Sequence, residues 1–201
     1  TSVAAGLDIV SCSGDKLLGA AQAGIIMGRR DLIQACGSHP LMRALRPGKL
    51  ALTALEATLR IYMDGADVAH RDIPVLSMLT LPQAHLERRA RKLRDLMAAG
   101  LDKAGCPCAV ELEIVEESST PGGGSLPTVE LPTMCVAVRP VDERLTVDAL
   151  KRSLVQDFDT PVVTRTSHER ILFNVRTLVG DRDIETAAST LAACVAKVAC
   201  R

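Results

Sequence analysis

Alternating apolar and polar residues in the second half of the chain predict a small antiparallel sheet with helices. Segments 110–114 and 134–138 both have the two-residue period of a half-buried strand. Thr146 is a suitable N-cap for a helix whose apolar residues recur every three or four positions. The expected elements are strands 110–114 and 134–138, a helix from 147 to about 158, a hairpin of 161–166 and 171–176 turning at 167–170, and a helix over 183–199. This order is typical of an α+β domain, here with two helices behind the sheet.

The first half of the chain combines two short apolar runs with several helical patterns. The runs 8–13 and 23–28 predict two buried strands, the second bounded by glycines. Helices are expected over 31–37, over 50–63 with a stripe of Leu52, Leu55, Leu59 and Tyr62, and over 83–99 with a stripe of Leu86, Ala90, Leu93 and Met97. A linker holding Pro74 and Pro82 separates the last two. We therefore place a domain boundary near 78–84, which divides the chain into 1–80 and 81–201 and gives an α/β fold class overall.

Composition narrows the function classes. The 201 residues include 47% hydrophobic residues, and 24 Lys and Arg balance 24 Asp and Glu. This is the composition of a soluble globular protein, and zero net charge argues against a protein that holds nucleic acid by bulk charge alone. The aromatic residues are Tyr62, Phe158 and Phe173, with no Trp. Stacking platforms for single-stranded nucleic acid and aromatic cages are therefore excluded.

The cysteines and the absence of long apolar runs indicate the compartment. No run approaches the roughly 18 apolar residues of a membrane span, and residues 1–30 lack the pattern of a secretory signal. The seven cysteines are scattered, and only Cys106 and Cys108 are close, with a spacing that does not fit zinc. The four histidines show no shared spacing. We therefore expect a cytoplasmic protein with reduced thiols, no membrane contact and no metal.

The sharpest chemical signal is the string Ser13-Gly14-Asp15-Lys16-Leu17-Leu18-Gly19. A lysine in a glycine-flanked turn between two buried strands is well placed for partial desolvation, which favours the neutral amine that acts as nucleophile or forms a Schiff base. The Ser13 hydroxyl on the same turn suits a phosphate group. The same string also fits a surface lysine in a tight turn that Asp15 stabilises.

A second signal is a group of basic residues. Arg43 and Arg46 share a face if their segment is helical, and with Lys49 nearby they suit a phosphate-like dianion. A solvated basic surface is the alternative. Arg176 shares an expected strand face with Leu172 and Asn174, where it either meets an anionic substrate or pairs with an acid.

Two further segments carry weaker signals. The glycines at 122–124 would allow a ligand to approach the backbone closely, or they form a mobile loop. They are not followed by the Gly-Lys-Ser/Thr sequence of a phosphate-binding loop. Five of the seven residues 88–94 are cations, but they surround their helix, which favours a solvated exterior over a phosphate-binding stripe.

Taken together, these strings resemble the bacterial selenocysteine synthases, the L-seryl-tRNA(Sec) selenium transferases, a family of fold-type-I enzymes dependent on pyridoxal 5′-phosphate. The resemblance covers most of the chain and rests on several motifs in the same order. They are 13–19, Gln22-Ala23-Gly24-Ile25-Ile26, Leu41-Met42-Arg43-Ala44-Leu45-Arg46, Lys49-Leu50, Ala54-Leu55-Glu56-Ala57-Thr58-Leu59, Gly122-Gly123-Gly124-Ser125-Leu126-Pro127 and Val175-Arg176-Thr177-Leu178.

The resemblance implies a role for each candidate residue. Lys16 would carry the cofactor as an internal aldimine, Ser13 would lie at its phosphate, and Asp15 matches the acid beside the lysine. Arg43 and Arg46 match the basic pair that receives selenophosphate. The implied reaction converts seryl-tRNA(Sec) to selenocysteinyl-tRNA(Sec) through an aminoacrylyl-tRNA intermediate, in a cytoplasmic homo-oligomer (a dimer or a ring of dimers).

The chain departs from the family pattern in two ways. The family usually has Gly-Gly-Pro-Gln after the lysine turn, where this chain has Gly19-Ala20-Ala21-Gln22. Family members also carry a long stretch before the lysine, with most of the cofactor-binding sheet. We therefore expect 1–80 to be the C-terminal part of the cofactor-binding domain, 81–201 to be the small C-terminal domain, and the chain alone to be inactive.

Two other functions fit the same residues. One is a pyridoxal-phosphate lyase acting on a small amino acid, with Arg176 holding the free carboxylate. The other is a non-catalytic fragment or interaction module.

Overall fold

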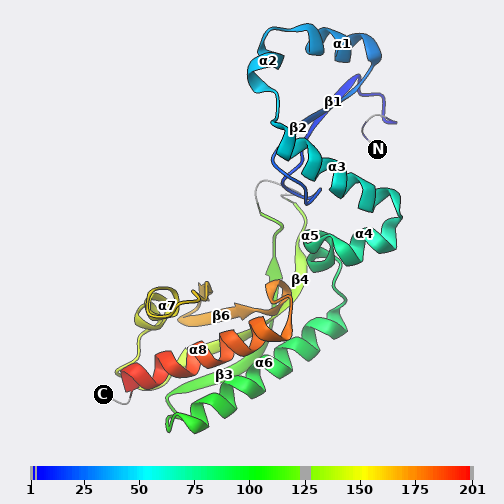
Figure 1. Cartoon of the computed structure of the whole chain (residues 1–201). Helices are drawn as coiled ribbons and strands as arrows, with labels where there is room; N and C mark the ends of the chain where they lie inside the picture. The colour runs from blue at the N-terminus through cyan, green and yellow to red at the C-terminus, as the bar shows by residue number, and fades with distance from the viewer. Residues whose placement is uncertain (1, 3, 123–127, 200–201) are drawn as a thin grey trace. The chain divides into compact units, whose positions relative to one another are not determined.

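The computed structural model describes residues 2, 4–122 and 128–199. Two compact units are present, one of residues up to Thr80 and one of most residues from Leu81 onward (Figure 1). Residues 123–127 of the predicted glycine-rich motif at 122–127, and Cys200, lie outside the described residues.

A four-stranded antiparallel sheet forms the second unit, with strand order β3-β4-β6-β5. Its strands are β3 (Val110–Ser119), β4 (Leu131–Pro140), β5 (Arg165–Ser167) and β6 (Arg170–Asn174). The helices are α6 (Gln83–Lys103), α7 (Val147–Gln156) and α8 (Asp181–Ala199), with a 3₁₀ turn, η1, at Val175–Thr177. The predicted order of strand, strand, helix, hairpin and helix is confirmed.

Three helices, rather than the two expected, back this sheet. α6 and α8 lie alongside each other (Figure 1), and α6 supplies Leu86, Leu93 and Met97 to the same core as the sheet. The Thr146 hydroxyl accepts a hydrogen bond from the Ala149 amide at 3.1 Å, which confirms the predicted N-cap of α7.

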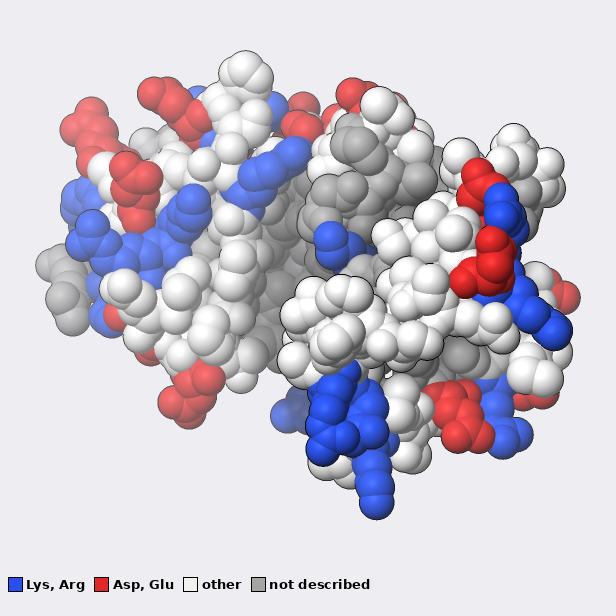
Figure 2. All heavy atoms as spheres, turned by 90° about the horizontal axis from the view of Figure 1, so that it is seen from above, with Lys and Arg blue, Asp and Glu red and all other residues white. Residues whose placement is uncertain are grey.

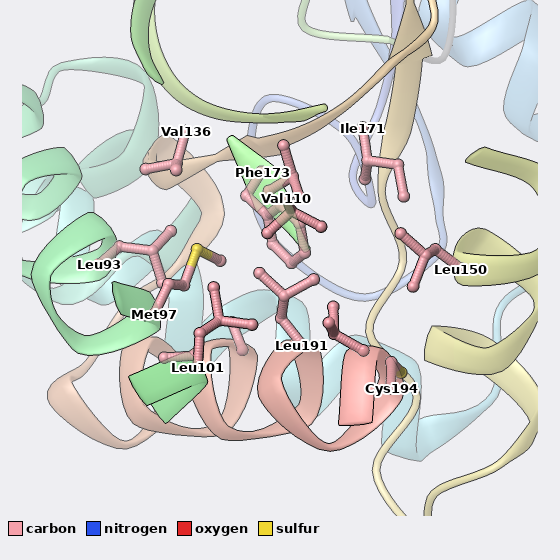
Figure 3. Packing of buried hydrophobic residues seen from close by; sticks show 14 of the residues in the cluster. Leu93, Met97, Leu101, Val110, Val136, Leu150, Ile171, Phe173, Leu191 and Cys194 are labelled. Carbon is pink, nitrogen blue, oxygen red and sulfur yellow. The ribbon is translucent and has the colours of Figure 1, made fainter. Parts of the chain in front are cut away.

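The core of the second unit lies between the helices and one face of the sheet. Figure 3 shows α6, the strands, α7 and α8 directing apolar side chains toward one another. Leu93, Val136 and Leu191 are fully buried there. Each such side chain stabilises the fold by about 1.5–3 kcal/mol relative to an exposed position, so this unit has a substantial core of its own.

Ion pairs bridge the opposite face of the sheet. Arg170 on β6 reaches Glu113 on β3 at 3.1 Å, and Arg165 on β5 reaches Glu117 on β3 at 2.7 Å. Both pairs cross β4, because it lies between their partners in the sheet order. Cys135 of β4 is fully buried on this face.

The first unit contains a hairpin and a run of helices. Its strands are β1 (Ile9–Ser13) and β2 (Gly24–Gly28), which pair antiparallel. Its helices are α1 (Arg30–Ser38), α2 (Leu41–Leu45), α3 (Lys49–Met63), α4 (Ala66–Asp72) and α5 (Pro74–Leu79). The segment predicted as a proline-containing linker contains two helices, α4 and α5. Pro74 is compatible with a helix because it lies in the first turn of α5, where no amide donor is needed.

The prediction that the two strands of the first unit are buried is wrong. β1 and β2 lie where predicted but are mostly exposed, since this two-stranded ribbon is not covered by a second layer within the described unit. Its buried described residues are Gly14, Ala23, Ala69 and Ile73. The α3 stripe is likewise open, with Leu52 47% and Leu59 41% exposed.

Candidate functional site

The predicted lysine turn is a loop closed by backbone hydrogen bonds between β1 and β2. The Gly14 amide donates to the Ala23 carbonyl and the Ala20 amide donates to the Gly14 carbonyl, each at 2.8 Å. The Gly19 amide donates to the Lys16 carbonyl at 2.9 Å, so Lys16 opens a four-residue turn. The backbone of Lys16 is therefore held inside a defined loop.

Gly19 closes this turn in a conformation that suits only glycine. Its φ is +69°, and a Cβ at this position would lie 2.6 Å from Ile73 Cγ2 and 2.9 Å from Val75 Cγ1. Next to it, the Tyr62 hydroxyl donates to the Leu18 carbonyl at 3.1 Å. The loop is thus packed against α3 and the start of α5.

The side chains of the loop include a hydroxyl, a carboxylate and an amine. The Ser13 hydroxyl donates a hydrogen bond to the Asp15 carboxylate. Lys16, expected to be partly desolvated, is exposed, because the strands on either side of it are themselves exposed. The site is therefore open to solvent within its unit.

The two arginines of the predicted anion site are close in sequence but do not share a helix. α2 ends at Leu45, and Arg46 is extended with ψ 126°. Pro47 explains this end, since a residue before proline disfavours the helical conformation. Arg43 and Arg46 are both exposed, and Lys49 begins α3. The condition for a shared helical face is not met, although three cations remain within seven residues.

Arg176 lies in η1 rather than on a strand, so the expected strand face is wrong. The Asn174 side chain accepts from the Arg176 amide at 3.0 Å and begins the 3₁₀ turn. The guanidinium is buried, with 7% exposure, and donates to the Pro132 carbonyl. Burial lowers the pKa of Arg176, because it disfavours the charged form. This arrangement joins η1 to β4.

Three cations of α6 take part in surface ion pairs. Lys92 lies 2.7 Å from Asp181, Arg94 lies 2.6 Å from Asp95, and Arg91 lies 3.7 Å from Glu87. Figure 2 shows both signs of charge distributed over the face in view. These contacts agree with a solvated exterior. Within the described ranges, no group of His, Cys, Asp or Glu is arranged to hold a metal ion.

Tyr62 is the residue of this site that the sequence did not reveal. We expected it only as part of an apolar stripe, whereas its hydroxyl is bonded 44 positions away to the loop of Lys16. The available signal was that Tyr62 is the only tyrosine of the chain.

Comparison with known proteins gives a consistent set of relatives. The family model for L-seryl-tRNA selenium transferase matches residues 1–179. The L-seryl-tRNA(Sec) selenium transferase of Aquifex aeolicus is 40% identical over 189 residues, covering 94% of this chain and 39% of that protein. Those of Moorella thermoacetica and Geobacter sulfurreducens are both 41% identical, covering 94% and 89% of this chain and 38% and 37% of the relatives. The chain thus spans about two fifths of the length of these curated relatives. Among the helices described, none is long and apolar enough to cross a membrane.

Proposed function

The chain belongs to the L-seryl-tRNA selenium transferase family, and we propose that it supplies the lysine-bearing part of an enzyme that makes selenocysteinyl-tRNA(Sec) from seryl-tRNA(Sec). The observation that carries this proposal is the loop of Lys16. Lys16 is exposed, its backbone is held by hydrogen bonds, and the same loop carries Ser13 and Asp15, which are hydrogen-bonded to each other.

These residues fit pyridoxal 5′-phosphate. The donor set contains a primary amine for the aldehyde and a hydroxyl for the phosphate, which are the groups such a cofactor needs. Lys16 would hold the cofactor covalently, Ser13 would bind its phosphate, and Asp15 would orient Ser13 through the hydrogen bond already present. When bound, the cofactor supplies an electron sink for charge that develops at the Cα of the seryl group.

Lys16 also suits the proton transfers of this reaction. Its amine would take the proton from Cα of the seryl group while hydroxide leaves Cβ. Selenium from selenophosphate would then add to Cβ as the amine returns the proton to Cα, and cleavage of the selenium–phosphorus bond by water would release phosphate. Because the Lys16 side chain is exposed, it can move between the positions that the two proton transfers require without rearrangement of a surrounding core.

Arg43 and Arg46 would bind selenophosphate. Both side chains are exposed, and guanidinium groups recognise a tetrahedral oxyanion with paired N–H donors. They lie three positions apart in the sequence, Arg43 in α2 and Arg46 directly after it.

We further propose that 1–80 belongs to a cofactor-binding domain, that 81–201 forms a small C-terminal domain, and that the working enzyme is a cytoplasmic homo-oligomer. The few buried residues of the first unit support a requirement for further protein around it. Alone, the chain should neither hold the cofactor tightly nor make selenocysteine. A stoichiometric visible absorbance band with pyridoxal phosphate, removed by borohydride and lost in Lys16→Ala, would contradict this.

A chimaera tests the activity. The matched segment of the Aquifex aeolicus transferase is replaced by this chain, and formation of selenocysteinyl-tRNA is measured with seryl-tRNA(Sec) and selenophosphate. We expect Lys16→Ala to abolish product and the matched control Lys151→Ala, an exposed lysine of α7, to leave it unchanged. An active Lys16→Ala chimaera would refute the proposal. Arg43→Gln with Arg46→Gln should raise the selenophosphate requirement while cofactor attachment is retained.

The lyase alternative needs Arg176 to hold a free carboxylate. Its guanidinium is buried and donates to a main-chain carbonyl, which favours a structural role for this residue.

A further inference from the structure

Hydrogen bonds hold the loop of Lys16 on both sides of the lysine. Near its start, Gly14 is hydrogen-bonded through its amide to Ala23 and through its carbonyl to Ala20. Near its end, the Leu18 carbonyl accepts the hydrogen bond from Tyr62. Lys16 lies between Gly14 and Leu18, two residues from each. Removing the hydrogen bond from Tyr62 would loosen the part of the loop that follows Lys16.

Tyr62 is suited to a fixed attachment. It stands in the last turn of α3, its side chain is half-buried, and burial raises the pKa of its hydroxyl. The hydroxyl is therefore protonated at neutral pH and available as a donor. Leu18 is also half-buried, so its carbonyl would be poorly hydrated without this donor.

We propose that Tyr62 is a positioning residue for Lys16: its hydroxyl holds the third residue of the four-residue turn that Lys16 begins, and so sets where the lysine amine lies. The importance of that amine rests on the proposed function. The backbone of Lys16 sets where its side chain begins, so a change at the turn would move the amine. Tyr62 acts on the reaction through this backbone and touches no reacting atom.

The test compares Tyr62→Phe with Thr58→Val. Phenylalanine keeps the ring and its packing and removes only the hydroxyl. Thr58 donates to the Ala54 carbonyl at 3.1 Å, so Thr58→Val removes a hydroxyl from the same helix without touching the loop. The first readout is hydrogen exchange of the Gly19 and Ala20 amides. We expect roughly five- to tenfold faster exchange in Tyr62→Phe, as for one lost hydrogen bond, and wild-type exchange in Thr58→Val.

The second readout separates positioning from simple stability. The chain is treated with excess pyridoxal phosphate and borohydride, and labelling of Lys16 is measured relative to Lys49, an exposed lysine of the same unit. We expect the ratio of Lys16 to Lys49 labelling to change at least threefold in Tyr62→Phe and to stay constant in Thr58→Val. Unchanged exchange overturns the proposal, and so does faster exchange with an unchanged labelling ratio.

Both measurements use the chain itself. An active Lys16→Ala chimaera would therefore remove the proposed enzyme function while leaving the effect of Tyr62 on the loop measurable, so the two failures are distinguishable.

Discussion

Replacing Gly19 with alanine should open the loop of Lys16, and the structure allows the cost to be worked out. Left-handed backbone at φ +69° costs alanine about 1–2 kcal/mol. The new Cβ would lie 2.6 Å from Ile73 Cγ2, and Ile73 is only 2% exposed, so it cannot move aside into solvent. Overpacking of this kind costs about 1–3 kcal/mol more. The two terms give a local destabilisation of roughly 2–5 kcal/mol.

Hydrogen exchange measures this effect residue by residue. A cost of about 2 kcal/mol corresponds to roughly thirtyfold faster exchange at the Gly14 and Ala20 amides, which close the loop. The matched control is Gly37→Ala in α1, where a Cβ meets no heavy atom within 4 Å. This control should leave the loop unchanged and stabilise its helix by up to about 1 kcal/mol. Exchange in Gly19→Ala within threefold of wild type would refute the steric reasoning.

Three further predictions concern the second unit. Leu191→Ala should destabilise it by about 2–5 kcal/mol in urea unfolding, because Leu191 is fully buried; a loss below about 1 kcal/mol would contradict the core described. Burial raises the pKa of Cys135 to about 11, so maleimide at pH 8 should modify exposed Cys108 and spare Cys135 until the unit unfolds, as peptide mapping would show. Hydrogen bonds from Arg144 lower the pKa of Asp142 to about 2. The stabilisation from Asp142 is therefore complete above about pH 4 and is lost as the pH falls through about 2. In Arg144→Met the side-chain hydrogen bonds are lost and the backbone one is kept, so a carboxyl titration by NMR should show the pKa of Asp142 rising toward its ordinary value without reaching it.

Local pattern was sufficient to predict the elements of the second unit. The alternation over 110–114 and 134–138 identified two strands, and the α6 stripe of Leu86, Leu93 and Met97 is buried as its spacing indicated. These predictions succeed because the partners that bury each face lie in the same unit, so amphipathicity and burial agree.

In the first unit, the same reasoning predicted the elements but not their burial. The stripe of α3 has helical spacing, yet Leu52 and Leu59 remain exposed, because an apolar face specifies a need for a partner and not where that partner is. The expectation of a desolvated Lys16 was wrong for the same reason, since it assumed buried strands.

Prolines and side-chain caps account for the remaining differences. Pro47 ends α2 before Arg46, and Pro74 starts a helix where the sequence suggested a linker. Asn174 begins a 3₁₀ turn that removes Arg176 from the strand. At each of these positions two local structures are permitted, and a neighbouring proline or capping side chain decides between them. Hydrophobic periodicity carries no information about that decision.

The unequal distribution of buried side chains between the two units also determines what a calorimeter would record. Heat absorption and the increase in heat capacity on melting scale with the apolar surface that becomes hydrated. Almost all of that surface belongs to the second unit, where the large buried cluster lies. A single melting temperature for this chain would therefore describe the sheet and its three helices, while the loop that carries Lys16 could loosen with little calorimetric signal.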